Sequence, residues 1–221
     1  MSSAATSEEH VVSRSHQLHD LYNVVTLPIV IISNVVTFYY FFVVGEPIES
    51  STNIFWWNVQ TAVLCTYIII DTVYIALNPD CVRSPKSILI HHIVVCTGWL
   101  LVLHRIPKYR GVGTCLLSIE INTFFMIARK FLPFRKYRRL IKFLDTAFYA
   151  TWVPLRIIIF PSGAIMSGVL AHQEYRATGI VISIPSVGFV LVSYIAVLNL
   201  KWSYDLLITK LYPKENSTYK K

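Results

Sequence analysis

The stretch Val24–Val44, VVTLPIVIISNVVTFYYFFVV, runs for 21 residues without a charged side chain. A helix of that length, rising 1.5 Å per residue, is about 30 Å long and crosses the hydrocarbon core of a bilayer. Turn-like residues end each such stretch, among them Pro161-Ser162-Gly163, where we expect the fifth helix to stop. The other apolar stretches, of which the third is short and the fifth contains an arginine, are Ile54–Leu77, Ile88–Leu103, Val112–Leu132, Phe143–Phe160 and Ile180–Leu200. The sequence therefore predicts an all-α, polytopic membrane protein with six transmembrane helices.

The composition favours the same class. Hydrophobic residues make up 54% of the chain and charged residues 14%, and the mean hydropathy is +0.53, which is too apolar for an ordinary soluble domain. The formal net charge is +8, but the basic residues lie between the apolar stretches, as they do in the loops of membrane proteins. We therefore expect membrane lipids as partners and no nucleic acid.

The four cysteines predict neither a disulfide framework nor a metal site. Cys65, Cys96 and Cys115 fall inside apolar stretches, Cys81 falls in a short loop, and no Cys-x-x-Cys spacing occurs. We expect no metal and no bound cofactor.

Basic residues collect in the fourth connection, at Arg129, Lys130, Arg135, Lys136, Arg138, Arg139 and Lys142. A loop this basic favours the cytoplasmic face of a membrane. With six spans, the polar N-terminal segment 1–22 and the basic tail 205–221 then both lie in the cytosol, flanking a transmembrane domain at 23–204. Three basic residues oppose this orientation, Arg105, Lys108 and Arg110.

Ionisable residues inside the apolar stretches mark a candidate site, because a charge in hydrocarbon costs several kcal/mol unless it faces a bundle interior or a wet cavity. Asp71 lies about six residues from the inner end of the second stretch, and His91 and His92 lie about as far into the third. The three side chains share one depth, so we expect their helices to be neighbours. We name Asp71, His91 and His92 as candidate catalytic residues, because imidazole transfers protons or attacks carbonyls near neutral pH. A purely structural ion pair is the alternative.

Further polar residues on the same faces are candidate substrate-binding residues. Tyr67 lies one helical turn before Asp71. In the fifth stretch a 4-3-4 spacing places four polar and aromatic residues on one helical face, which we expect to point inward: Asp145, Tyr149, Trp152 and Arg156. Glu120 lies in the middle of the fourth stretch and is a candidate ion-pair partner for Arg156. The candidates are Tyr67, Glu120, Asn122, Asp145, Tyr149, Trp152 and Arg156.

Five signatures in order resemble those of the TLC-domain family, which includes the ceramide synthases, translocon-associated proteins and small lipid-linked TLC proteins. They are Tyr67-Ile-Ile-Ile-Asp71, Ile90-His91-His92-Ile93, Ser118-Ile-Glu120-Ile-Asn122-Thr123-Phe124 with Arg129, Arg156-Ile157 with Phe160-Pro161, and Asn199 with Trp202. The resemblance implies a six-helix bundle around a lipid-sized cavity open to the cytosol. It also implies a role in membrane lipid homeostasis, in the endoplasmic reticulum or another endomembrane.

The resemblance to ceramide synthases is incomplete. Those enzymes carry a His-Asp pair and a further Asp on the helix after the double histidine; aligned through Gly113-Thr114, this chain has Ile119-Glu120 and Asn122-Thr123 there. The Glu-x-Asn-Thr form is similar instead to the small TLC proteins.

Two functions fit these residues. In the first, the protein is an acyl-CoA-dependent lipid N- or O-acyltransferase, with acyl-CoA as co-substrate, a histidine as base and Asp71 as its orienting partner. In the second, it is a non-catalytic lipid-binding, trafficking or translocon-associated membrane protein. A proton-coupled transporter is less favoured, because no inverted repeat is visible.

Overall fold

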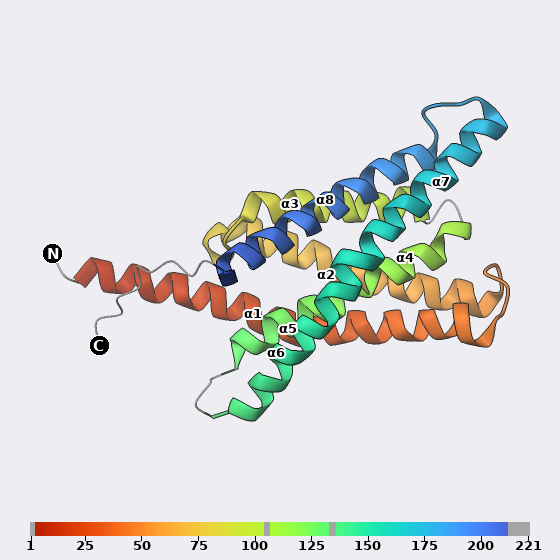
Figure 1. Cartoon of the computed structure of the whole chain (residues 1–221). Helices are drawn as coiled ribbons and strands as arrows, with labels where there is room; N and C mark the ends of the chain where they lie inside the picture. Colours follow the sequence, from red (N-terminus) through yellow and green to blue (C-terminus); the bar gives the residue numbers. More distant parts are fainter. Residues whose placement is uncertain (1–2, 104–106, 133–135, 212–221) are drawn as a thin grey trace.

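The computed structural model describes residues 3–103, 107–132 and 136–211, and within these ranges every regular element is helical (Figure 1). Short π-helical segments extend or join the longer helices at Tyr39–Val44, Gly98–Leu103 and Val153–Ile159. The α-helices are α1 Ser3–Phe38, α2 Ser51–Leu77, α3 Pro85–Thr97, α4 Arg110–Leu117, α5 Ile119–Phe131, α6 Arg138–Trp152, α7 Phe160–Thr178 and α8 Ile184–Leu211. The prediction of an all-α protein is confirmed.

Five helical stretches of the described chain are long and apolar enough to cross a membrane. They are Arg14–Val44, Ser51–Leu77, Arg110–Phe131, Arg138–Thr178 and Ile184–Thr209. The remaining predicted span corresponds to a shorter apolar helix, Pro85–Leu101. An integral membrane protein is thus supported, whereas the count of six spans stays a prediction.

The expected end of the fifth helix at Pro161 is wrong. The chain continues without a break from α6 through a π-helical segment, Val153–Ile159, into α7, and Pro161 lies in the first turn of α7. Proline removes one backbone donor, but next to a π-helical turn the hydrogen-bond register already changes, so the lost bond does not end the helix.

Two glycines end long helices where a side chain would be strained. Gly45 follows the first membrane helix with φ +73°, and Gly179 follows α7 with φ +71°, both in the left-handed region that glycine adopts without a steric cost. The next helix, α2, begins where the Ser50 hydroxyl accepts a hydrogen bond from the Asn53 backbone N–H at 3.2 Å. These caps place the turns between the spans.

The bundle is apolar outside and polar inside. Side chains such as Ile32, Phe143 and Ile165 are exposed on its outer surface, as expected for lipid-facing positions. In contrast, the buried residues include many polar ones, among them Asn23, Asn34, Gln60, Asp71, His92, Asn122, Arg156 and Asn199. The start of α1, the end of α8, the α2–α3 connection and the adjoining ends of α5 and α6 all lie toward one end of the bundle (Figure 1). Several basic segments therefore meet at that end of the bundle.

Candidate functional site

A central cavity of about 970 Å³ lies between the helices, and all eight described α-helices and the π-helical segment between α6 and α7 contribute to its wall. Much of the wall is apolar, from residues such as Leu116, Phe160 and Ile195. Seven of the predicted site residues line it, namely Tyr67, Asp71, His91, His92, Glu120, Trp152 and Arg156. An apolar cavity with a few convergent polar groups is the usual form of a ligand site.

Asp71 is the centre of a buried cluster in this cavity. Its side chain lies on α2 and the residue is 3% exposed. The carboxylate Oδ1 lies 2.8 Å from Nε2 of His19, and Oδ2 lies 3.5 Å from Nε2 of His92. The other ring nitrogen of His92 is 2.9 Å from the Thr72 hydroxyl. Two imidazoles from different helices therefore hold one carboxylate, and α2 and α3 are neighbours.

His19 is absent from the sequence-based candidates, because residues 1–22 were interpreted as a polar segment outside the membrane. In the structure α1 runs through residue 22 without a break. A sequence signal was present: His16, His19, Asp20 and Asn23 follow the i, i+3, i+4, i+7 spacing of one helical face. Asn23 fixes this turn, since its amide donates to the His19 carbonyl at 2.9 Å and accepts from the Tyr67 hydroxyl at 2.7 Å.

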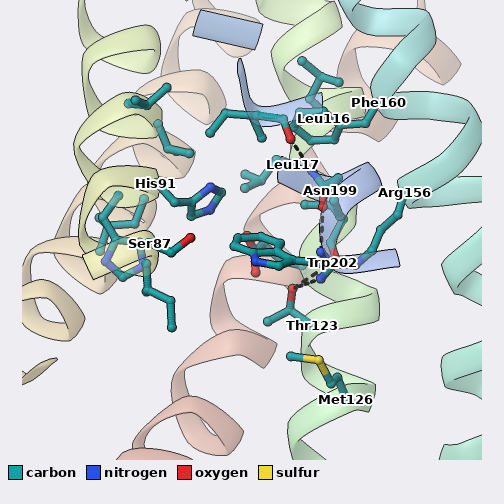
Figure 2. Close-up of a pocket in the computed structure, with 18 of the residues that line it drawn as sticks. Ser87, His91, Leu116, Leu117, Thr123, Met126, Arg156, Phe160, Asn199 and Trp202 are labelled. Carbon is teal, nitrogen blue, oxygen red and sulfur yellow. Dashed lines mark hydrogen bonds between the residues drawn. The ribbon is translucent and has the colours of Figure 1, made fainter. Parts of the chain in front are cut away.

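His91 points away from Asp71. Its ring extends from α3 into the central cavity toward Trp202, with the two ring centroids 5.6 Å apart (Figure 2). Its Nδ1 atom is buried and has no hydrogen-bond partner among the described residues. The adjacent histidines thus differ: His92 contacts Asp71 and Thr72, whereas His91 lies in the cavity wall beside Trp202.

Arg156 lies in the π-helical segment and is held by three neutral oxygens, of which those of Thr123 and Asn199 are seen in Figure 2. Its Nε donates to Asn122 Oδ1 at 2.7 Å, its Nη1 to Asn199 Oδ1 at 2.7 Å and its Nη2 to Thr123 Oγ1 at 3.0 Å. The expected direct ion pair with Glu120 is wrong, because no Glu120 oxygen lies within 4.0 Å of the guanidinium. A π-helical turn shifts the register of a helix, so the face on which Arg156 lies does not follow from the regular period of an α-helix.

The predicted stripe on the fifth span divides in the structure. Trp152 lines the cavity and donates from Nε1 to the Ser203 hydroxyl at 2.9 Å. Asp145, whose side chain is 49% exposed, lies outside the lining and pairs at 2.9 Å with Arg129. Tyr149 also lies outside it, with its ring 5.7 Å from the Arg129 guanidinium. Asn122 does not line the cavity, but it accepts a hydrogen bond from Arg156, which does.

The lining of the cavity carries charged groups near the bundle end at which α3 begins and α5 ends. Arg83, Lys130 and Lys201 contribute there, together with Asp20 and Asp205. Lys201 and Asp205 pair at 3.3 Å. Basic groups are thus in excess among the charged lining residues at this end of the bundle.

Cys81, in the loop between α2 and α3, is fully buried. Burial raises the pKa of its thiol to about 11, so it stays protonated at neutral pH and is a poor nucleophile. Within the described part of the chain, no group of three or more His, Cys, Asp and Glu side chains has an arrangement suited to a metal ion.

A family model for the TLC domain matches residues 21–208. This range is well over half of the chain and contains every predicted site residue. No curated protein and no solved structure matches the sequence.

Proposed function

This chain belongs to the TLC-domain family, and from that premise we propose that it acts in membrane lipid homeostasis as an acyl-CoA-dependent lipid acyltransferase of an endomembrane. The observation that carries the proposal is the imidazole of His91 in the wall of a large, mostly apolar cavity, beside Trp202. Ligand cavities measure about 300–1,000 Å³. A volume of about 970 Å³ is large enough for a long acyl chain and part of a headgroup.

The basic residues Arg83, Lys130 and Lys201 suit the phosphates of acyl-CoA, which would enter from that end with its acyl chain along the apolar wall. His91 takes the proton of the acceptor's N–H or O–H group as this nitrogen or oxygen attacks the thioester carbonyl. The carbon–sulfur bond breaks, and the departing CoA thiolate receives the proton from His91. The products are an amide or ester and free CoA.

In this scheme His92 is a positioning residue. It is anchored to Asp71 and Thr72, and its ring centroid lies 5.8 Å from that of His91. Asp71 holds His92 and thereby fixes the rotation of α3, on which His91 also lies. His19 completes the anchor from α1.

The test is incubation of the purified protein with labelled acyl-CoA and a panel of lipid acceptors that carry an amine or a hydroxyl group. We expect an acylated lipid and an equal amount of free CoA, and we expect His91→Ala to abolish both. His172→Ala is the matched control, because His172 lies on α7 outside the central cavity. Product formation that survives in His91→Ala would contradict the assignment.

A second function is favoured by the contacts of Asp71, whose two carboxylate oxygens both have histidine partners. Both carboxylate oxygens face histidines within 3.5 Å, an arrangement that also suits a purely structural lock between α1, α2 and α3. The protein would then bind lipid in the same cavity without turnover, as a lipid carrier or a trafficking partner. Stoichiometric retention of lipid, with no acyl transfer to any acceptor, would select this function.

A further inference from the structure

We propose that Arg156 binds the anionic group of a lipid, a phosphate or a carboxylate, inside the central cavity. The proposal rests on the proposed function to the extent that the same cavity takes a lipid. It adds the headgroup class, which the acyl-transfer scheme leaves open.

The first argument is that the charge of Arg156 is not neutralised by direct contact. The residue is 9% exposed, and all three of its hydrogen bonds go to amide or hydroxyl oxygens. No carboxylate of the described residues lies within 4.0 Å of its nitrogens. A buried cation costs several kcal/mol, and neutral acceptors offset that cost only in part.

The second argument is that the guanidinium has donors left. Of its five N–H groups, three are used by Asn122, Asn199 and Thr123. The remaining two, one on Nη1 and one on Nη2, have no hydrogen-bond partner among the described residues. A guanidinium that keeps one free N–H group on each Nη has donors left for a carboxylate or phosphate.

The third argument is access. Arg156, Thr123, Asn199 and Trp202 all line the cavity, and Figure 2 shows Arg156, Thr123 and Asn199 grouped across it from His91, with Trp202 beside His91. A lipid anchored by its anionic group at Arg156 therefore has other atoms within the space that His91 faces. The three neutral partners fix the guanidinium before any ligand arrives, which lowers the entropic cost of binding.

Glu120 sets the strength of this site. It lines the same cavity on α5, beyond direct ion-pair distance from Arg156 but close enough for the two charges to interact. A carboxylate at that distance lowers the affinity of Arg156 for a second anion without occupying its donors. Removal of the Glu120 charge is therefore expected to strengthen anion binding.

The experiment uses three probes with one chain length: dodecyl phosphate, dodecanoate and dodecanol. Their affinities are measured on the purified full chain in a neutral detergent, through quenching of tryptophan fluorescence and the shift in Tm. In the wild type we expect both anions to bind more tightly than the alcohol. Arg156→Gln should weaken anion binding at least about tenfold, the effect of losing a charge-assisted hydrogen bond, and leave dodecanol binding unchanged.

A second variant keeps the proposal testable if Arg156→Gln fails to fold. Asn199→Asp is nearly isosteric and places a carboxylate against Nη1 of Arg156, at the position of a 2.7 Å hydrogen bond. It should preserve the fold and abolish the preference for anions, whereas Glu120→Gln should retain or increase it. Equal binding of anions and alcohol in the wild type, or an anion preference that persists in both Arg156→Gln and Asn199→Asp, would overturn the proposal.

Two further arms identify the source of the anion. Inorganic phosphate or unacylated CoA that displaces dodecyl phosphate would overturn the assignment to a lipid headgroup, whereas failure to displace it supports that assignment. The acyl-transfer assay separates this inference from the proposed function. An Arg156-dependent anion preference without acyl transfer upholds the inference alone, and acyl transfer without that preference refutes the inference alone.

Discussion

At the scale of single residues, two adjacent histidines have different surroundings. His92 contacts Asp71 and Thr72, whereas His91 lines the cavity beside Trp202, and its buried Nδ1 has no hydrogen-bond partner among the described residues. Neighbouring positions on a helix point about 100° apart, so one histidine can hold the protein together while the other meets a ligand. Mutations at the two positions are therefore expected to separate stability from function.

The first prediction contrasts His91→Ala with His92→Ala. His91→Ala should remove activity or lipid response and leave the thermal stability nearly unchanged, because no protein hydrogen bond to its Nδ1 is lost. His92→Ala should lower stability by about 1–3 kcal/mol, because Asp71 and Thr72 each lose a buried partner. Unfolding of both variants in the same detergent, followed by fluorescence, measures the difference. Equal destabilisation would show that both histidines are structural.

The second prediction concerns the reaction. This chain has Ile119-Glu120 and Asn122-Thr123 where ceramide synthases carry a His-Asp pair and a further Asp, so it lacks their acidic set. Asn122 instead holds the Nε of Arg156, and Glu120 makes no direct ion pair with that arginine. We expect no ceramide when the purified protein is given a sphingoid base and acyl-CoA. Ceramide formation that depends on His91 or His92 would refute this prediction.

At the scale of helices, small residues set the distance between α7 and α8. A Cβ added at Gly168 would lie 2.9 Å from the Phe189 ring, closer than real contacts allow, whereas one added at Gly98 would meet Leu191 at an ordinary 3.7 Å. Close approach through small residues is common between membrane helices, where lipid supplies no hydrophobic driving force for association.

The third prediction follows from these two distances. Gly168→Ala should be less stable than Gly98→Ala by about 1–3 kcal/mol, because the Phe189 ring must move to accept the methyl group. Both changes remove a glycine from a helix, so the intrinsic gain in helix propensity cancels in the comparison. The midpoints of thermal or denaturant unfolding measure the difference. Equal midpoints would mean that the α7–α8 contact is soft.

The same scale explains what the sequence could and could not predict. Apolar length predicts the membrane helices, and the shared depth of Asp71, His91 and His92 predicts that their helices are neighbours, as the contact between Asp71 and His92 shows. The predicted helix end at Pro161 is wrong, because this proline next to a π-helical turn does not end the helix. The sequence-based prediction omits His19, because it places the polar residues 1–22 outside the membrane. The helical spacing of the polar residues around His19 is nevertheless visible in the sequence.

At the scale of the whole molecule, the arrangement of the ends bears on orientation. The start of α1, the end of α8 and the adjoining ends of α5 and α6 lie toward one end of the bundle (Figure 1). Basic residues of α6, including Arg138, Arg139 and Lys142, lie at that end. If basic segments face the cytosol, the cavity residues Arg83 and Lys130 face the compartment that supplies acyl-CoA.

The last prediction is that this end is cytosolic. Asn216-Ser217-Thr218 is a glycosylation sequon that lies outside the described residues, and in a cytosolic tail it stays unmodified. Two single-cysteine variants in a cysteine-free background supply the control: Arg83→Cys at the basic end and Glu49→Cys in the connection between α1 and α2. In sealed microsomes a membrane-impermeant maleimide should label the first and spare the second until detergent is added. A glycan at Asn216, or the reverse labelling pattern, would place the entrance of the cavity in the lumen. Acyl-CoA could not then approach Arg83 and Lys130 from the cytosol, so this measurement also bears on the proposed reaction.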